Sequence, residues 1–331
     1  MQASRFDGWL PIRFYWQAGA PWLDWCHFGD QRLTEPFFRG SVGEALNHPF
    51  NLAFRRQTPI AALEELHDSR PGLEPTAFLF HASRCGSTLV SQMLAALPTH
   101  IAISEAPMID SVLRAHYFSP AATEELRVHW LRALVSSLAR PRHGETRFFV
   151  KLDAWNIFEL ATLRKAFPRT PWIYLYRDPL EIAVSQMKER AVYMIPGMLG
   201  ASLPFMDPRE IAGMPHTDFV ARVLGKMLEA GNAGCVEAGG IPLRYDELPE
   251  AGWTWLRETL GVGDDPGSLE AMKAAARPHA KQPHFEFTPD SRRKQQEASA
   301  DLRQAVEHWA MPAYQALERT RAAREPAPKP R

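Results

Sequence analysis

The chain has 331 residues, with 38 Lys and Arg against 38 Asp and Glu, so its formal net charge at pH 7 is zero. This length allows a large buried core, and the neutral balance provides no overall attraction to nucleic acid or to an anionic membrane. Three widely separated cysteines, Cys26, Cys85 and Cys235, follow no metal-ligand spacing, which argues against structural zinc or a disulfide framework. No window reaches the roughly 20 apolar residues of a membrane span. The sequence therefore predicts a soluble, cytoplasmic protein that binds neither nucleic acid nor membrane.

Residues 1–70 are dense in aromatic side chains and are interrupted by Gly and Pro. This composition predicts short strands or turns around an aromatic cluster, in an accessory segment that precedes the main domain at 71–322. Two roles remain open for the segment: a cap that packs on the main domain, or an aromatic wall for a substrate. The last residues, 323–331, are rich in Pro and charge and are expected to be disordered.

A strand, a polar loop and a helix are predicted in succession over residues 76–98. Residues 77–80 form an apolar run of strand length, and apolar residues then recur at helical spacing until Pro98. The first turn of a helix leaves backbone N–H groups unpaired and carries the positive end of the helix dipole. Gly86 lets an anion approach the backbone, Ser87 and Thr88 add hydroxyl groups, and Arg84 adds a cation. The pattern favours a phosphate or sulfate ester, although an ordinary strand-to-helix turn would use similar residues.

Further strands and helices alternate along the chain after this loop. Such alternation predicts an α/β fold with a parallel sheet that is flanked by helices on both faces. Strands are expected at 101–104, 147–151, 172–176 and 241–245, and helices at about 107–117, 121–140, 154–167, 180–190, 217–238, 252–261, 266–276 and 297–321.

The segment 191–216 is rich in Met, Gly and Pro and contains no convincing helical pattern. Long irregular insertions of this kind are often lids or substrate loops. We therefore expect it to act as a lid or acceptor loop.

A second candidate motif lies where the strand at 172–176 runs into a helix, at the edge where open α/β sheets bind ligands. Arg177 and Ser185 are separated by 185 − 177 = 8 residues. A guanidinium group and a hydroxyl suit a phosphomonoester. The alternative for Arg177 is an ion pair with Asp178 or a role in capping the helix.

The two motifs together resemble those of the sulfotransferases that use 3′-phosphoadenosine 5′-phosphosulfate (PAPS). In a P-loop nucleotidase a lysine follows the second glycine, whereas here the cation, Arg84, precedes Gly86. The family more often has serine where this chain has Cys85. The resemblance, which covers residues 76 to about 250, implies a P-loop-like sulfotransferase fold. The donor-binding residues that it implies are Ser83, Arg84, Cys85, Gly86, Ser87, Thr88, Arg177, Ser185 and Tyr245, with Arg177 and Ser185 at the 3′-phosphate and Tyr245 near the adenine.

The resemblance also implies the chemistry: PAPS as co-substrate, no metal, and an acceptor that carries a hydroxyl group. Glu105, at the end of the second strand, matches the glutamate general base of some members, with His100 and His116 as rivals. Lys151 resembles a lysine that contacts the donor near its bridging oxygen, and Asp153 is a candidate for orienting it. The implied catalytic residues are therefore Glu105, Lys151 and Arg84. A weaker match for the family's C-terminal basic segment is Arg292, Arg293 and Lys294.

Two other functions remain open. A nucleotide-dependent kinase or hydrolase would require magnesium and ATP, and a non-catalytic module on the same fold would bind nucleotide without turnover. The acceptor and the oligomeric state cannot be read from the sequence.

Overall fold

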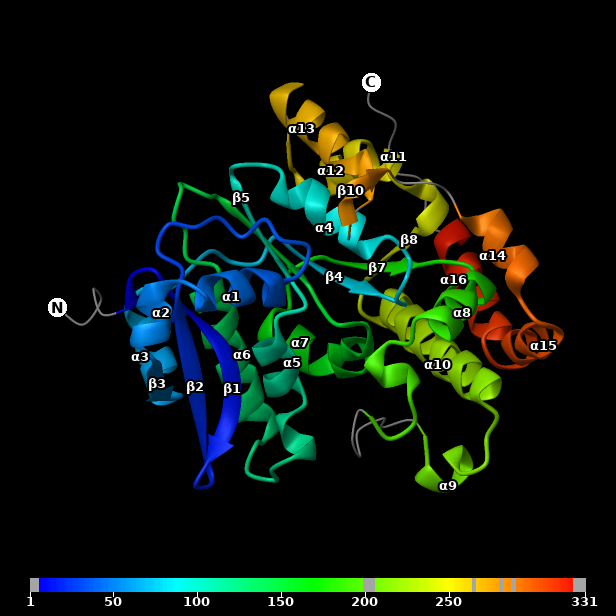
Figure 1. Ribbon diagram of the computed structural model, residues 1–331, viewed down its shortest axis with the longest axis horizontal. Helices are drawn as coiled ribbons and strands as arrows, with labels where there is room; N and C mark the ends of the chain where they lie inside the picture. Colours follow the sequence, from blue (N-terminus) through cyan, green and yellow to red (C-terminus); the bar gives the residue numbers. More distant parts are fainter. Residues whose placement is uncertain (1–5, 199–205, 264–265, 280–281, 287–289, 324–331) are drawn as a thin grey trace.

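A five-stranded parallel sheet runs through the middle of the computed structural model (Figure 1). The strand order is β5–β6–β4–β7–β8, and every neighbouring pair is parallel. The predicted α/β class with a parallel sheet is therefore confirmed. The strands are β4 (Ala77–His81), β5 (His100–Ser104), β6 (Arg147–Lys151), β7 (Trp172–Tyr176) and β8 (Ile241–Arg244). The structure describes residues 6–198, 206–263, 266–279, 282–286 and 290–323.

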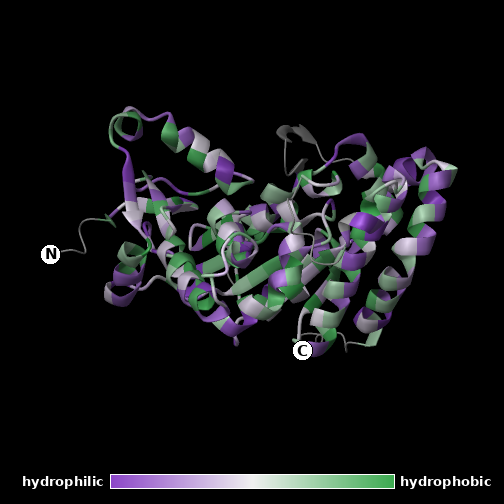
Figure 2. Ribbon diagram, turned by 90° about the horizontal axis from the view of Figure 1, so that it is seen from below, coloured by the Kyte–Doolittle hydropathy of each residue, from purple (hydrophilic) through white to green (hydrophobic). Residues whose placement is uncertain are grey.

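The two faces of the sheet are covered by different sets of helices. All five residues of β4 are buried, and they alternate between the two faces, as the period of a strand requires. Leu79 packs into a cluster with α4 and α11–α13, whereas Phe78 and Phe80 pack into a larger cluster with α5–α7 and α10. Figure 2 shows the hydrophobic strands inside and helices of mixed hydropathy outside. One set is α4 (Ser87–Ala95), α11 (Glu250–Trp253), α12 (Trp255–Leu260) and α13 (Pro266–Ala276), and the other is α5 (Pro107–Leu113), α6 (Glu124–Leu138), α7 (Leu160–Ala166) and α10 (His216–Glu237).

The N-terminal segment forms its own three-stranded antiparallel sheet, in the order β1–β2–β3, beside α5 and α6 (Figure 1). The ring of Phe14 lies 5.8 Å from that of Trp130 in α6, so the aromatic residues pack directly on the main sheet's helices. The division into an accessory segment and a main domain stays a prediction. The elements are β1 (Trp9–Gln17), β2 (Ala20–His27), α1 (Phe38–Leu46), α2 (Pro49–Ala53), β3 (Arg56–Pro59) and α3 (Ala61–Ser69).

The three helices of this segment were not expected from the sequence. Helix α1 contains two glycines, Gly40 and Gly43, which lower its intrinsic helix propensity. Buried contacts of Phe38 and Ala45 compensate for this. Tertiary packing, and not local propensity, thus explains why this stretch forms a helix.

The C-terminal helices also differ from the expectation. The predicted basic segment at 291–294 begins a helix, and the predicted helix over 297–321 is two helices that are separated at Ala310. Pro312, in the first turn of the second helix, has no N–H with which to continue the first. These helices are α14 (Ser291–Glu297), α15 (Ala300–Trp309) and α16 (Met311–Ala323).

The predicted helix at 154–167 starts as a 3₁₀ helix, η3 (Ala154–Glu159), before α7. The helix predicted over 180–190 is α8 (Pro179–Lys188). The remaining short elements are η2 (Ala115–Tyr117), η5 (Tyr245–Glu247) and an antiparallel pair formed by β9 (Pro278–His279) and β10 (Gln282–Glu286).

The predicted irregular segment 191–216 contains two short helices, η4 (Val192–Met194) and α9 (Pro208–Ile211), so the expectation of no helix was wrong there. Tyr193 and Met194 are buried, which anchors the start of the segment in the core. Residues 199–205 lie outside the described residues, as do residues 324–331 of the predicted disordered tail. The role of the segment as a lid stays a prediction.

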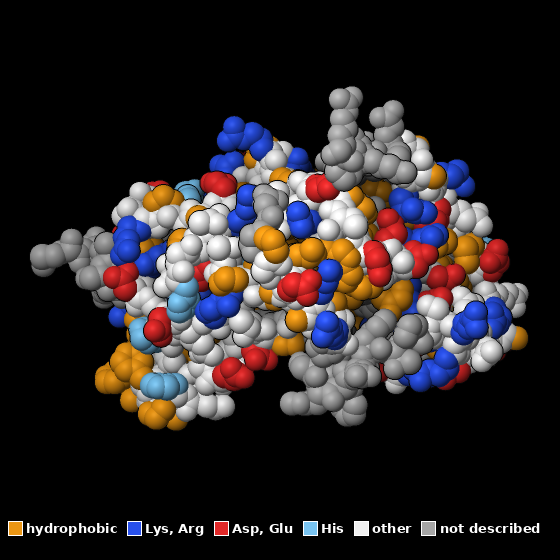
Figure 3. Space-filling model, turned by 90° about the horizontal axis from the view of Figure 1, so that it is seen from above, with side chains coloured by type: hydrophobic (Ala, Val, Ile, Leu, Met, Phe, Trp, Pro, Cys, Tyr) orange, Lys and Arg blue, Asp and Glu red, His pale blue; other side chains and the backbone are white. Residues whose placement is uncertain are grey.

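Positive and negative side chains are interspersed over the face that Figure 3 shows. All three cysteines are free and buried. Among the described residues, no helix is both long enough and apolar enough to cross a membrane.

Candidate active site

The loop between β4 and α4 follows a left-handed path. Ser83 and Arg84 have φ angles of 68° and 48°, and Gly86 has a φ of 83°. Left-handed backbone is costly for residues with a side chain, and such strain gathers at functional sites. A Cβ atom at Gly86 would lie 2.7 Å from Cδ1 of Leu248, so this position requires glycine for space as well as for conformation.

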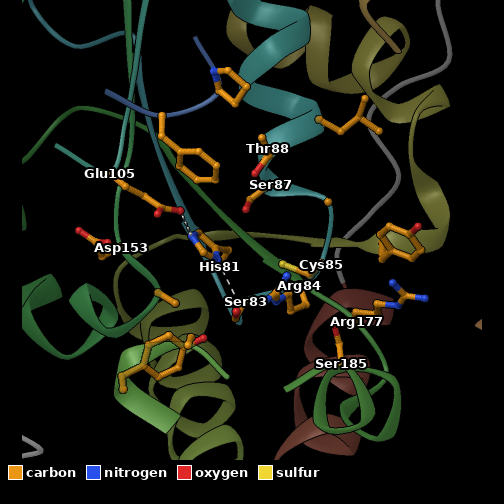
Figure 4. Close-up of a pocket in the computed structure, with 18 of the residues that line it drawn as sticks. His81, Ser83, Arg84, Cys85, Ser87, Thr88, Glu105, Asp153, Arg177 and Ser185 are labelled. Atoms are coloured by element: carbon orange, nitrogen blue, oxygen red, sulfur yellow. Dashed lines mark hydrogen bonds and ion pairs between the residues drawn. The ribbon is translucent and has the colours of Figure 1, made fainter. Parts of the chain in front are cut away.

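The side chains that follow Gly86 lie where an anion would be stabilised. Ser87 and Thr88 form the first turn of α4 and line the cavity (Figure 4). The unpaired N–H groups and the dipole of this turn favour negative charge. Cys85 is different, because its buried thiol donates a hydrogen bond to the carbonyl oxygen of Leu175, at 3.2 Å. Burial raises the pKa of Cys85 to about 12, so the thiol stays protonated at neutral pH, and its role in ligand binding stays a prediction.

A cavity of about 790 Å³ opens at the carboxyl ends of the parallel strands. It brings together most of the residues that the sequence indicates. Those that line it are Ser83, Arg84, Cys85, Gly86, Ser87, Thr88, Glu105, Asp153, Arg177, Ser185, Tyr245 and Lys294.

Other sequence candidates do not line this cavity. His100 is buried against the carbonyl oxygen of Leu94, and His116 lies 3.9 Å from the carboxylate of Glu159. The structure therefore does not bring either rival general base to the site. Arg292 and Arg293 are exposed on α14, away from the cavity lining.

Lys151 lies beneath Glu105 and does not itself line the cavity. Its side chain is 1% exposed, its Nζ donates to Oε1 of Glu105, and the ring centroid of Phe37 lies 5.0 Å from Nζ. Glu105 has a φ of 52°, a strained value that holds its side chain at the end of β5. The two residues meet because β5 and β6 are paired, with Ser104 opposite Lys151.

The pKa of Glu105 reflects this ion pair. Burial by itself would raise the pKa, but the charge of Lys151 and the hydrogen bond from His81 outweigh burial and hold it well below its usual range. Glu105 is therefore ionised at neutral pH, which a proton acceptor requires. Its basicity is low as long as Lys151 stays paired with it.

His81 is a site residue that the sequence reasoning missed. Its Nδ1 accepts a hydrogen bond from the N–H of Ser83, at 3.0 Å, so the neutral ring carries its proton on Nε2. Nε2 lies 3.1 Å from the carbonyl oxygen of Leu152 and 3.5 Å from Oε1 of Glu105 (Figure 4). His81 thus connects the loop to Glu105. The available signal was a polar residue at the end of an otherwise apolar strand.

Asp153 lies beside Glu105 at the same sheet edge (Figure 4). Its carboxylate caps η3 in a reciprocal pair with Asn156. Burial raises the pKa of Asp153 well above its ordinary value, and the charges of Glu105 and Asp110 add to the shift. The predicted role of Asp153 in orienting Lys151 stays a prediction.

Arg177, at the other end of the cavity, is held by two carboxylates. Its Nε donates to Oε2 of Glu181 at 2.5 Å, and its Nη2 donates to Oδ1 of Asp290 at 2.6 Å. The ring of Tyr245 lies 4.0 Å from the guanidinium carbon. Asp178 is not its partner, because Asp178 caps α8 by accepting a hydrogen bond from the N–H of Leu180.

Helix α14 adds a second cation to this end. The Nζ of Lys294 lies 2.8 Å from Oδ2 of Asp290, so Asp290 bridges Lys294 and Arg177. Burial would raise the pKa of Asp290, but hydrogen bonds from both cations lower it. With Glu181 included, two positive and two negative groups meet here. Arg84 is paired likewise, with the carboxylate and the carbonyl oxygen of Glu189.

The arrangement suits an anionic ligand that extends from the first turn of α4 towards Arg177. The carboxylate of Glu105, at the opposite end of the cavity from Arg177, could accept a proton. Among the described residues, no group of three or more His, Cys, Asp and Glu side chains could hold a metal ion.

Comparisons with known proteins found similar sequences and structures. Residues 75–197 match the sequence profile of the sulfotransferase family. A sulfotransferase from Alicyclobacillus acidocaldarius is similar at 16% identity, over 76% of this chain and 97% of that chain, with a TM-score of 0.46. The sulfotransferase domain of the olefin synthase from Synechococcus PCC 7002 is similar at 17% identity, over 78% and 98%, with a TM-score of 0.39. No curated protein matches the sequence. Both TM-scores are below 0.5, and the family match covers less than half of the chain.

Proposed function

We propose that this chain, whose residues 75–197 match the sulfotransferase family, transfers a sulfuryl group from PAPS to an acceptor hydroxyl. The observation that carries the proposal is the convergence of the loop at 83–88, Arg177, Ser185 and Glu105 on one cavity. These groups come from β4, β5 and β7 and the helices that follow them. Their common location at the carboxyl ends of parallel strands is the usual ligand site of this architecture.

In this proposal the loop holds the 5′-phosphosulfate. Ser87, Thr88 and the backbone of the first turn of α4 would donate hydrogen bonds to its oxygens. Arg84 would add charge, after exchanging its contacts with Glu189 for the ligand. Leu248 and Tyr245 pack against Gly86 where a Cβ atom would stand, so glycine is required there for the left-handed turn and for this packing.

Arg177 and Ser185 would hold the 3′-phosphate, and this requires a change of partners. The pairs of Arg177 and Lys294 with Glu181 and Asp290 leave no net charge for a phosphate dianion. Asp290 is the group that could yield, because it belongs to the segment before α14 and its side chain is 26% exposed, whereas Glu181 is fixed in α8. Release of Asp290 would remove one negative charge from Arg177 and Lys294 together, while Glu181 would stay paired with Arg177.

Glu105 is the proposed general base. The oxygen of the acceptor would attack sulfur in line with the bridging oxygen, so that one S–O bond forms as the other breaks. The acceptor proton would pass to Glu105, and adenosine 3′,5′-bisphosphate would leave. Lys151 would stabilise charge on the bridging oxygen by shifting away from Glu105, which would also make Glu105 more basic.

Thermal stabilisation by adenosine 3′,5′-bisphosphate, compared with ATP and AMP, tests the donor assignment. A ligand at 100 times its Kd stabilises the folded state by about 2.7 kcal/mol. We expect the bisphosphate to raise the Tm, and AMP at the same concentration to have a much smaller effect. Equal increases in Tm with all three nucleotides would contradict the proposal that the site recognises the 3′-phosphate.

One observation favours a second candidate, a module that binds nucleotide without turnover. Glu105 is closed into an ion pair with a buried lysine, an arrangement that can serve structure alone. Transfer of ³⁵S from labelled PAPS to water or to any acceptor would exclude this alternative. Magnesium-dependent ATP hydrolysis would instead indicate the kinase or hydrolase class.

A further inference from the structure

The acceptor side of the cavity is built from three segments that lie far apart in the sequence. One belongs to the N-terminal segment, outside the part of the chain that matches the family profile. The other two follow β6 and α8. Of the residues that line the cavity, the first segment contributes Glu35, Phe37 and Arg39, and the other two contribute Trp155 and Tyr193.

The N-terminal part of this wall is anchored on the main domain just upstream of Phe37. The guanidinium of Arg32 donates to the carbonyl oxygens of Ala95 and Leu97, at 3.1 and 2.9 Å. The amide of Gln92 donates to the carbonyl oxygen of Thr34, at 3.2 Å. These bonds connect residues 32–34 to α4 and its C-terminal end, so Phe37 is placed over Lys151 by fixed contacts on the helix that begins at the donor loop.

The polar atoms of the other two rings are already hydrogen-bonded. The Nε1 of Trp155 donates to Oδ1 of Asp110 at 2.6 Å, and the hydroxyl of Tyr193 accepts from Nε2 of Gln186 at 3.1 Å. The two ring centroids are 5.2 Å apart with the planes tilted by 49°. Trp155, which is half-buried, therefore offers mainly ring surface to a ligand, and Tyr193, which is buried, supports the Trp155 ring from behind.

This chemistry distinguishes between classes of acceptor. A sugar would bring several hydroxyl groups that each need a hydrogen-bonding partner, and burying an unpaired one is unfavourable. A planar aromatic compound needs only one polar contact and gains from rings that pack edge-to-face or offset. An acidic acceptor would also meet Glu35 and Glu105, with Arg39 as the cation among the segment 35–40.

We propose that the acceptor is an uncharged, planar aromatic hydroxyl compound, whose ring packs against Phe37 and Trp155, with Tyr193 behind Trp155 and with its hydroxyl directed at Glu105. The inference rests on the proposed function, since it names the class of acceptor for that site. Phe37 is then a specificity-determining residue that the N-terminal segment contributes.

The probes are 2-naphthol, its saturated counterpart decahydro-2-naphthol, and N-acetylglucosamine, each titrated calorimetrically with and without adenosine 3′,5′-bisphosphate. We expect the wild-type protein to bind 2-naphthol about 3- to 10-fold more tightly than the saturated alcohol, because the gain from ring packing is of this size. We expect the sugar to bind more weakly than either. Equal or tighter binding of the saturated alcohol or the sugar would overturn the inference.

Phe37→Ala should weaken 2-naphthol binding about 5- to 10-fold and leave the affinity for adenosine 3′,5′-bisphosphate unchanged, and Phe37→Leu should lie between. Phe54→Ala is the matched control, since Phe54 belongs to the same N-terminal segment, is 59% exposed and does not line the cavity. If Phe37→Ala fails to fold, Phe37→Leu still decides, because it keeps the bulk and removes the ring.

Loss of bisphosphate and naphthol binding to the same extent in a folded Phe37 variant would show a structural role and overturn the inference. A wild-type chain that binds the bisphosphate but not 2-naphthol would overturn the inference alone. A chain that binds 2-naphthol but not the bisphosphate would overturn the proposed function and leave the aromatic site standing.

Discussion

The two ends of the cavity are built on different principles. At the donor end, charged groups are paired with one another: Arg177 with Glu181 and Asp290, Lys294 with Asp290, and Arg84 with Glu189. At the acceptor end, aromatic rings share the wall with Glu35 and Arg39, and the ion pair Glu105–Lys151 lies at the border. A charged ligand needs fixed, directional partners, and strand ends of a parallel sheet supply them. A neutral acceptor needs a shaped apolar surface, which elements outside the sheet can supply.

The largest effect on turnover is expected from a substitution at the border between the two ends. Glu105→Gln keeps the shape of the carboxylate but cannot accept a proton, so we expect turnover to fall by about 10²- to 10⁴-fold while donor affinity is retained. Single-turnover transfer from labelled PAPS measures the rate, and a bisphosphate titration measures the affinity.

Since Gln leaves Lys151 without its charged partner, the Tm of the variant should be recorded beside the rate. A folded variant that binds donor normally and transfers sulfate at a near wild-type rate would exclude Glu105 as the base.

At the donor end, Arg177→Ala should weaken binding of adenosine 3′,5′-bisphosphate by about 2–4 kcal/mol, the usual cost of losing one partner of a buried, charge-assisted contact. Binding of AMP should change little. Arg292→Ala is the control, because Arg292 is an exposed arginine of α14 that does not line the cavity. Equal losses for both nucleotides would remove the assignment of the 3′-phosphate to Arg177.

Asp290→Asn should change the affinity for adenosine 3′,5′-bisphosphate in the opposite direction from Arg177→Ala. Removal of the Asp290 charge leaves one positive charge in excess at Arg177 and Lys294, because Glu181 still pairs with Arg177. Affinity for adenosine 3′,5′-bisphosphate should therefore rise by about 2- to 5-fold, as expected for a competing charge pair of about 0.5–1 kcal/mol. Asp301→Asn, in the first turn of α15, changes the net charge equally and serves as the control. Weaker binding in Asp290→Asn would mean that Asp290 belongs to the bound state.

The smallest expected effect is the change that Asp153→Asn makes to the pH dependence of stability. Its pKa is raised in the folded protein, so the folded state binds the proton more tightly than the unfolded chain, and stability is lost as pH rises from about 4 through the raised pKa. Asp153→Asn keeps the cap on η3 but cannot ionise. We expect its Tm to exceed that of the wild type at pH 8, with a smaller difference at pH 4.5. A pH-independent difference would show that the ionisation of Asp153 does not affect stability.

The lining of the donor end was largely readable from the sequence, because the determinants are local. Gly86 and the hydroxyl residues after it follow an apolar strand and begin a helix, and all of them line the cavity as expected. Arg177 and Ser185 are eight residues apart on one strand-to-helix junction, so short-range geometry alone brings them to the same side.

Other features depended on contacts between segments that are distant in the chain. The pairing of Arg177 with Asp290 joins residues 113 positions apart, and local spacing could indicate only Asp178. The role of His81 depends on the meeting of β4, β5 and β6, since its partners are Leu152 and Glu105.

The sequence by itself determined the parallel α/β sheet, the glycine- and hydroxyl-containing turn that begins α4 and the carboxylate at the end of β5, because strand and helix periodicity and turn chemistry act over a few residues. Only the tertiary structure decided that Lys151 is buried beneath Glu105, that Asp290 forms an ion pair with Arg177, and that Phe37 covers the border between the two ends. Each of these depends on the burial of side chains from separate elements against one another, and the free energy of such packing is a property of the assembled core rather than of any local pattern.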